Sequence, residues 1–258
     1  MSDYPKTEKE AVMHYLIKDT DFLKISQFLE QIKGIHTNNL EALRLFIEAV
    51  YFILRSGCQW CLLSSNYRNW RAIHKRFKAW SDRGIWQQLF EHLQDPDLEW
   101  TSGDSTIVRA HACAAGYGKD TQKQEALGRS KGGFSTKVHA LVDALGNPLR
   151  FLLSPGQQHD ITLAHQLRTG FEHIPFIGDK SYDADHFTET MPDNSCVPPR
   201  KNRKKPRNYD EHLYKERHTI ECLIGKMKHF RRVFSRFDKS AKTYLSFLCL
   251  VGAFIWLR

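Results

Sequence analysis

The residues best suited to chemistry lie in the stretch 214–228, YKERHTIECLIGKMK. On one continuous helix turning about 100° per residue, Tyr214, Arg217, Glu221 and Lys228 fall within a stripe about 60° wide. A carboxylate flanked by two cations and a phenol is poised to hold a metal ion beside a phosphate. The alternative interpretation is a surface ion pair between Arg217 and Glu221.

Two aspartates earlier in the chain could complete such a site. Asp104 lies in the β-branched run 103–108, where an acidic residue is out of character for a strand. Asp179 ends an apolar strand, which is where α/β folds place their ligand crevice. Alone, Asp104 could cap a strand end and Asp179 could form a turn. In phosphodiester chemistry, two divalent metals about 3.5–4 Å apart, held by a few carboxylates, can activate the attacking oxygen and stabilise the leaving one. Together with Glu221, the two aspartates therefore predict metal-dependent phosphodiester chemistry.

The elements that would position these acids begin after Asp95-Pro96-Asp97, where the pattern changes. The predicted strands are 99–110, 135–143, 148–153, 174–178 and 196–198, with a hairpin turn at 144–147. The predicted helices are 160–167, 183–191, 214–228 and 239–257. This order is that of an α/β, ribonuclease H-like catalytic core: a mixed five-stranded sheet with helices over residues 96–258.

Residues 1–95 are expected to form an all-helical N-terminal domain. Apolar residues recur at helical spacing in 40–54, 70–80 and 85–93, and Asp82-Arg83-Gly84 is a turn between the last two. Two helices joined by a short glycine-containing turn suit a helix-turn-helix module. Its cations Arg71, Lys75 and Arg76 would then contact DNA. The alternative is a solvated basic face on an ordinary helical bundle.

Composition favours a polyanionic binding partner and a location inside the cell. The 258-residue chain is 41% hydrophobic, carries a net charge of +9 and has a pI of about 9.2. The excess of cations favours nucleic acid. Six scattered cysteines predict reduced thiols and a cytoplasmic protein. The most apolar run, 244–257, is shorter than the ~20 residues of a spanning helix, so no membrane is expected.

Several motifs together resemble the DDE-type transposases of bacterial insertion sequences, in the insertion-sequence-4/5 superfamily. The signature Y-x2-R-x3-E-x6-K is matched in full by Tyr214, Arg217, Glu221 and Lys228. Residues 103–106 (GDST) resemble the motif of the first aspartate, and 178–183 (GDKSYD) that of the second. The segments 54–60, 128–137 and 143–148 and the pair 231–232 are also typical of this family. The sequence departs from the family at Cys61-Leu62-Leu63, and Ser181 stands where glycine is common.

The resemblance implies two Mg²⁺ (or Mn²⁺) shared by Asp104, Asp179 and Glu221 as catalytic residues, with Arg217 and Lys228 holding phosphate. Tyr214 would stack on a base or hydrogen-bond a phosphate, or simply pack. It also implies binding to double-stranded DNA, namely terminal inverted repeats and target DNA, and a homo-oligomer acting on paired ends at the bacterial nucleoid. A plain nuclease and an inactive DNA-binding regulator remain the alternatives. Further predicted DNA contacts are Arg129, Lys131, Lys137, Arg200, Lys201, Arg203, Lys204, Lys205, Arg231 and Arg232.

Overall fold

The computed structural model describes residues 16–35, 39–115, 125–205 and 207–258. Its N-terminal part is helical, which fits the expectation for residues 1–95 within the described range. The helices are α2 (Asp19–Glu30), α3 (Leu40–Ser56), α4 (Trp70–Asp82) and α5 (Ile85–His92), with one-turn 3-10 helices η1 (Trp60–Leu62) and η2 (Ser65–Tyr67).

Local chemistry sets both ends of α3. The Asn39 side chain accepts a hydrogen bond of 2.8 Å from the Ala42 N–H at the start of the helix. Gly57 ends the helix with φ of 67°, a left-handed conformation that favours glycine. A β-carbon at Gly57 would lie 2.8 Å from Cβ of Arg231. The end of α3 is therefore packed against the segment that follows the proposed catalytic helix.

A mixed sheet forms the other half of the molecule. Its central strand β1 (Thr101–Ala110) pairs antiparallel with β3 (Gly133–Val142) on one side. The outer edge of β3 pairs with β2 (Gly128–Ser130) and β4 (Pro148–Pro155). The other edge of β1 pairs in parallel with β5 (Phe176–Gly178) at its start and β6 (Ser235–Arg236) at its end.

The predicted five-stranded sheet is therefore corrected to six strands. The expected fifth strand at 196–198 is reduced to a single parallel bridge between Ile177 and Cys196. Pro198 and Pro199 follow directly, and proline has no backbone N–H to donate to a ladder. The short strands β2 and β6 were not expected, because two or three residues leave no periodicity in the sequence.

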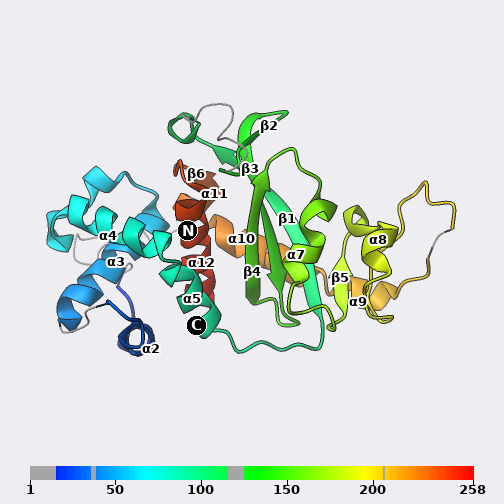
Figure 1. The fold of residues 1–258 in the computed structure, drawn as a ribbon, viewed down its shortest axis with the longest axis horizontal. Helices are drawn as coiled ribbons and strands as arrows, with labels where there is room; N and C mark the ends of the chain where they lie inside the picture. Colours follow the sequence, from blue (N-terminus) through cyan, green and yellow to red (C-terminus); the bar gives the residue numbers. More distant parts are fainter. Residues whose placement is uncertain (1–15, 36–38, 116–124, 206) are drawn as a thin grey trace, which may run out of the picture.

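The remaining elements are short turns and helices around the sheet. They are η3 (Ala112–Ala114), η4 (Asp160–Leu163), α7 (Ala164–Arg168), η5 (Lys180–Tyr182), α8 (Asp185–Thr188), α9 (Glu211–Lys215), α10 (His218–Lys228), α11 (Arg231–Phe234) and α12 (Ala241–Trp256). The prediction of one helix over 214–228 was wrong, because the chain turns between α9 and α10. Figure 1 shows α10 crossing behind the sheet, and α7 and α8 at the opposite side.

The helix α12 joins the helical part to the sheet. It packs against α5 and α4 as well as β4, and lies between the two halves in Figure 1. Phe247 of α12 stacks on Phe77 of α4 with ring centroids 4.5 Å apart. One buried apolar cluster runs from the N-terminal helices through α12 and α10 to β1 and β3. The buried core is continuous across residue 95. A domain boundary at that residue therefore remains a prediction made from the sequence.

Candidate active site

Two aspartates meet where β5 ends beside β1. Gly103 of β1 pairs with Gly178 of β5 in parallel register. The residues that follow them, Asp104 and Asp179, therefore lie side by side on the two neighbouring segments. Parallel neighbours of this kind are about 4.8 Å apart. A β-carbon at Gly103 would lie 2.6 Å from the Phe176 ring, so this close strand packing requires glycine.

Asp179 is held by the turn that follows it. It caps η5: its Oδ1 accepts a hydrogen bond of 2.9 Å from the Ser181 N–H and a second hydrogen bond from the Ser181 hydroxyl. The serine at the position where the family commonly has glycine therefore has a defined role here. Its hydroxyl orients one oxygen of Asp179 and leaves the other without a donor among the described residues.

Asp104 is largely buried, with 17% of its side chain exposed. Burial raises the pKa of Asp104, and the charges of Asp179 and Asp160 act in the same direction. The Arg217 guanidinium and the Ser105 N–H, which donates to Asp104 Oδ1 at 2.7 Å, lower this pKa. The net shift of the Asp104 pKa is upward, because burial outweighs the effect of the Arg217 charge and the Ser105 hydrogen bond.

Arg217 links two of the three predicted acids. It lies between α9 and α10, where its Nη2 bonds Asp104 Oδ2 and its Nη1 bonds Glu221 Oε1 at 2.6 Å. Glu221 is in the first turn of α10, and 59% of its side chain is exposed. The ion pair that sequence offered as an alternative is therefore present, but it also includes Asp104. The Nε atom of Arg217 is buried and has no hydrogen-bond partner among the described residues.

These residues form an acidic site that suits a hard cation. Carboxylate oxygens are the ligands that Mg²⁺ and Mn²⁺ prefer, and Asp104 and Glu221 already share one positive group. Among the described residues, no three His, Cys, Asp or Glu side chains are arranged to bind one ion as they stand. Arg217 accounts for this arrangement, because its guanidinium engages an oxygen of Asp104 and an oxygen of Glu221 that an ion would need.

The remaining members of the predicted stripe are not all beside the acids. Tyr214 is half-buried in α9 and packs edge-to-face on Tyr209, with ring centroids 5.8 Å apart. Lys228 is exposed at the end of α10.

Lys137 of β3 does not point free into solvent: its Nζ donates to the Gln158 carbonyl at 2.7 Å and to Asp160 at 2.9 Å. We therefore withdraw the prediction of a DNA contact by Lys137.

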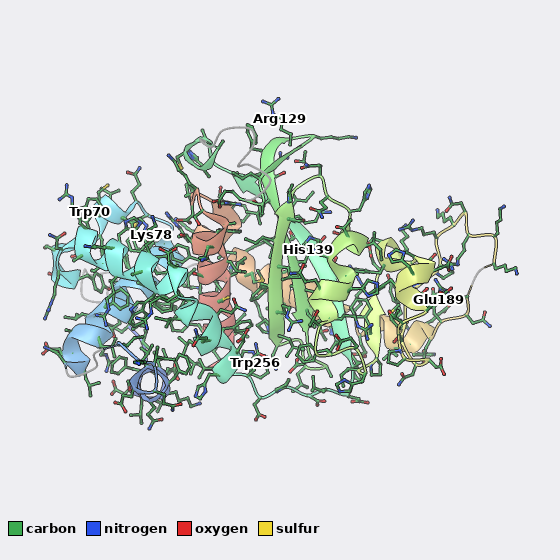
Figure 2. All side chains as sticks on the ribbon, viewed as in Figure 1. Trp70, Lys78, Arg129, His139, Glu189 and Trp256 are labelled. Atoms are coloured by element: carbon green, nitrogen blue, oxygen red, sulfur yellow. The ribbon has the colours of Figure 1, made fainter. Side chains whose placement is uncertain are left out.

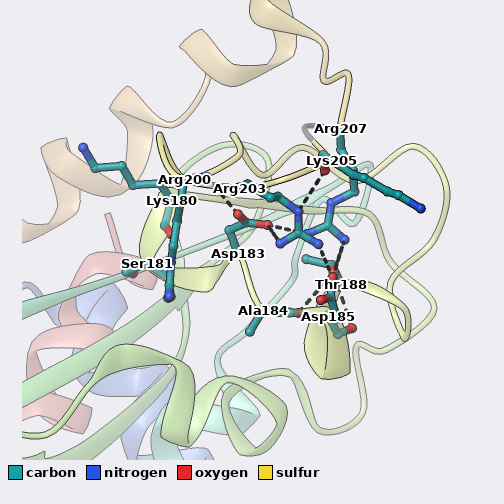
Figure 3. A network of polar contacts seen from close by, with 10 residues as sticks. All are labelled: Lys180, Ser181, Asp183, Ala184, Asp185, Thr188, Arg200, Arg203, Lys205 and Arg207. Carbon is teal, nitrogen blue, oxygen red and sulfur yellow. Dashed lines mark hydrogen bonds and ion pairs between the residues drawn. The ribbon is translucent and has the colours of Figure 1, made fainter.

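The basic loop 200–207 is folded onto two aspartates (Figure 3). Arg203 contacts Asp183 at 2.7 Å and also bonds Asp185, and Arg207 bonds Asp183 as well. Arg203 thus serves the fold, because the fully buried Asp183 carboxylate needs cationic partners. The Arg200 guanidinium donates to the carbonyls of Lys180 and Ser181, at 3.2 and 3.0 Å.

Lysines of the same loop stay available to DNA. Lys201, Lys204 and Lys205 are exposed, and the side chain of Lys205 extends away from the network in Figure 3. The loop therefore divides its cations by type. Arginines, whose planar fork suits carboxylates and carbonyls, anchor the backbone next to Asp179, and lysines face solvent.

Two other predicted DNA contacts pack against the protein itself, Arg232 fully and Arg76 in part. Arg232 is buried, and its guanidinium contacts Asp238 at 2.8 and 3.1 Å. Arg76 lies over the rings of Phe46 and Trp80, 4.4 and 4.9 Å from their centroids. The prediction for Arg232 is wrong, because sequence shows the charge of an arginine but not the buried partner that covers it. A DNA contact by the half-buried Arg76 stays a prediction. Figure 2 labels Arg129 where it projects from β2 into solvent. The other exposed members of the predicted set are Lys131, Arg231, Arg71 and Lys75.

Sequence reasoning missed three polar residues around the aspartates. Asp160, at the start of η4, accepts from Ser105 Oγ at 2.6 Å and from Lys137. Asp183 orders the basic loop. Tyr182 is buried, and within the described part of the chain its hydroxyl has no hydrogen-bond partner. Signals existed for Asp183 only: it lies in the 178–183 motif, and a nearby run of six cations in residues 200–207 implied an acidic partner.

Comparison with known proteins agrees with this geometry. The family described as "Transposase DDE domain" matches residues 101–253, and "Putative transposase of IS4/5 family" matches residues 17–90. The chain therefore belongs to the DDE transposase family. That domain implies a ribonuclease H-like core and dependence on divalent metal ions.

Two curated proteins are similar to parts of this chain. The "Putative transposase for insertion sequence element IS6501" of Brucella ovis is 38% identical over 129 residues, which cover 48% of this chain and 99% of the relative. "Uncharacterized protein y4sN" of Sinorhizobium fredii is 40% identical over 85 residues, which cover 33% of this chain and 65% of the relative. No solved structure matches.

The protein is thus an insertion-sequence transposase, an enzyme that cleaves DNA. Its partner class is DNA, as the net charge of +9 predicted. Within the described part of the chain, no helix has the length and apolarity needed to cross a bilayer.

Proposed function

We propose that Asp104, Asp179 and Glu221 are the catalytic carboxylates and that together they hold two Mg²⁺ (or Mn²⁺). The observation that supports this most directly is the parallel register of Gly103 with Gly178, which places Asp104 inside β1 next to Asp179 at the end of β5. Glu221 is joined to the pair through Arg217. The bound ions would activate the attacking oxygen and stabilise the leaving one.

The reaction proceeds in two displacements at phosphorus. Water attacks the phosphodiester at the element end, a new P–O bond forms, and the 3′-oxygen leaves and takes up a proton. That 3′-hydroxyl then attacks a target phosphodiester, forms the joint between element and target, and displaces the 3′-oxygen of the target strand. No protein side chain becomes covalently attached to DNA in either step.

Arg217 changes partner during this sequence in our proposal. Before DNA binds, its guanidinium neutralises Asp104 and Glu221. With Asp104 and Glu221 holding a divalent ion, the Arg217 guanidinium would bind the scissile or flanking phosphate through two parallel hydrogen bonds. Lys228 contacts a phosphate farther along α10 as a point charge. Tyr214 borders the same DNA strand, where it packs or stacks.

DNA lies across surfaces on both halves of the protein in this proposal. The exposed cations of α4, Arg71 and Lys75, belong to a helix-turn-helix module formed by α4 and α5 in residues 1–95, which binds the terminal inverted repeats. The catalytic unit is residues 96–258. Its flanking contacts are Arg129, Lys131, Arg200, Lys201, Lys204, Lys205 and Arg231. The enzyme acts as a homo-oligomer on paired ends and target DNA, at the nucleoid of the bacterial cytoplasm.

Conservative replacement of each acid tests the site. Asp104→Asn, Asp179→Asn and Glu221→Gln should each abolish cleavage of an element end while leaving end binding in a mobility-shift assay unchanged. Glu189→Gln, which removes one exposed charge at the end of α8, is the matched control (Figure 2). Cleavage by the Asp104→Asn enzyme would disprove the assignment. A strand-transfer assay with pre-cleaved ends separates a transposase of this mechanism from a plain nuclease.

A further inference from the structure

A second group of polar residues lies on the face of the sheet opposite the proposed active site. Asp104 of β1 pairs with Ala140, which belongs to the buried cluster that includes α10. The next residue, Ser105, pairs with His139, and His139 is followed by Leu141 of the cluster that includes α7 on the same face. Successive side chains of a strand point to opposite faces. Asp104 therefore faces α10, and Ser105 faces η4 and α7 on the other side of the sheet (Figure 1).

Ser105 is held by two hydrogen bonds, one on each side of its own backbone. Its hydroxyl donates to Asp160 Oδ1 at 2.6 Å, although Asp160 is 55 positions away in the sequence. Its backbone N–H donates to Asp104 Oδ1 at 2.7 Å. On that edge of β1, β5 pairs only as far as Gly103, so no strand of the described chain supports the two residues that follow. The bond to Asp160 thus steadies the residue whose N–H orients the Asp104 carboxylate.

Asp160 is in turn anchored to the neighbouring strand β3. Its Oδ1 accepts from Lys137 Nζ at 2.9 Å, and Lys137 also donates to the Gln158 carbonyl at 2.7 Å. Only 11% of the Lys137 side chain and 19% of the Asp160 side chain are exposed, and salt screens such a pair much less than an exposed one.

The charge of Asp160 fixes the direction of its bond with Ser105. Burial raises the pKa of Asp160, but the hydrogen bonds from Ser105 and Lys137 lower it by more, so the net shift is downward. An ionised carboxylate can only accept hydrogen bonds. The Ser105 hydroxyl must therefore donate to Asp160, which leaves its side chain one orientation.

Tyr182 shows that Asp160 belongs with the two aspartates of the proposed site. Its ring is buried against Phe176, with ring centroids 5.3 Å apart. Burial raises the pKa of the Tyr182 hydroxyl well above its ordinary value, and the charges of Asp160, Asp104 and Asp179 act in the same direction. All three carboxylates thus lie close enough to this one buried hydroxyl to act on it.

We propose that Asp160 is a positioning residue of the active site, which acts through Ser105 on the orientation of Asp104. The proposal rests on the proposed function, since it takes Asp104 to be a metal ligand. With Asp104 Oδ1 held by the Ser105 N–H, Oδ2, which bonds Arg217, is the oxygen presented to an ion. Groups that hold a ligand in this way typically account for about 10–100-fold in metal affinity.

Mn²⁺ binding to the full-length protein tests this role without any cleavage. The electron paramagnetic resonance signal of free Mn²⁺ gives the affinity, and Asp104→Asn defines the binding that belongs to the acids. Ser105→Ala removes the hydroxyl and should weaken this binding about tenfold. Ser105→Thr keeps a hydroxyl on a residue that suits a strand, and should restore most of the affinity. Unchanged affinity in Ser105→Ala, or an equal loss in Ser105→Thr, would overturn the proposal.

A double-mutant cycle tests whether Asp160 acts through Ser105. Lys137→Met together with Asp160→Ala removes both charges of the ion pair, so that neither is left buried alone. This pair of changes should weaken Mn²⁺ binding by about the same factor as Ser105→Ala, and adding Ser105→Ala to it should cost little more. Losses that multiply would show two independent effects and would overturn the proposed action through Ser105.

Ser135→Ala is the matched control. Ser135 lies two residues before Lys137 on β3, on the same face of the sheet, and its buried hydroxyl donates to Ser130 at 3.0 Å. Its removal should lower the Tm without changing Mn²⁺ affinity. If Ser135→Ala lost as much Mn²⁺ affinity as Ser105→Ala, the effect would be a general loosening of the sheet and the proposal would be wrong.

The two proposals fail separately. If Asp104→Asn binds Mn²⁺ as wild type does, the proposed metal site itself is refuted. If Asp104→Asn loses the ion but Ser105→Ala retains it with wild-type affinity, only the positioning role of Asp160 is refuted. Thermal unfolding in EDTA establishes that each variant compared is folded, so that a folding defect is not taken for lost metal binding.

Discussion

Arg217→Gln tests the central charge of the site without changing any acid. The replacement leaves the Asp104 carboxylate, 17% exposed, without its cation, and Asp179 and Asp160 add like charge nearby. Breaking a buried ion pair costs about 3–5 kcal/mol. The exposed Glu221 contributes at most about 0.5 kcal/mol.

With residual solvent at Asp104, we expect the free energy of unfolding at pH 7.5 and without metal to fall by about 2–3 kcal/mol. For a chain of this size that lowers Tm by about 4–10 °C.

The stability of this variant should also depend on pH. Without Arg217 the folded protein binds a proton at Asp104 more tightly than the unfolded chain does. Stability then falls as pH rises from the unfolded pKa, near 3.9, to the higher folded pKa. The deficit of the variant should therefore be smaller near pH 5 than at pH 7.5.

Metal addition provides the second measurement for this variant. A divalent ion stabilises whichever protein binds it, by an amount that rises with its affinity. Because the ion need not displace a guanidinium in Arg217→Gln, Mn²⁺ should raise the Tm of the variant more than that of wild type. Lys226→Gln removes one exposed charge on the same helix and is the control. Equal stability of Arg217→Gln and wild type in EDTA, or an equal response to Mn²⁺, would refute the competition between Arg217 and metal.

Three further predictions concern the fold around the site. Arg232→Met should lower the unfolding free energy by about 3–4 kcal/mol in urea, because it leaves buried Asp238 unpaired; adding Asp238→Leu should recover most of the loss. Gly57→Ala should cost about 1–2 kcal/mol in thermal unfolding, since φ is 67° and the new Cβ would meet Arg231 at 2.8 Å. Burial raises the pKa of Asp183, but hydrogen bonds from three arginines lower it by more, so the net shift of this pKa is downward. The stability from Asp183 is therefore present above its unfolded pKa and lost below about pH 4. Asp183→Asn should make acid unfolding shallower, and an unchanged acid limb would contradict this account.

The sequence was informative where chemistry and local periodicity coincide. Asp104 and Asp179 were picked out as an acid inside a strand and an acid at a strand end, and the parallel register sets them side by side. The i,i+4 spacing of Arg217 and Glu221 predicted their contact. What spacing could not reveal is the second contact of Arg217, with a residue 113 positions away in the sequence.

Tertiary partners decide the features that sequence reasoning missed. No glycine or proline marks the turn between α9 and α10, so residues 214–228 were interpreted as one helix. The arginines of the basic loop and of α11 carry the same charge whether they face DNA or a buried aspartate. Only packing distinguishes Arg203 and Arg232, which pair internally, from Lys204 and Arg231, which are exposed.

The position of α12 has a consequence for how the enzyme is made. Residues 241–256 complete the core of helices that are synthesised some 150 residues earlier, as the contacts of Phe77 with Phe247 and of Phe90 with Gly252 show. At translation rates of about 5–20 residues per second, the N-terminal helices wait roughly 8–30 seconds for this helix. During that interval their apolar faces depend on chaperones or on transient contacts. A nascent chain therefore cannot present its finished helical part before the sheet and its acids have also been synthesised.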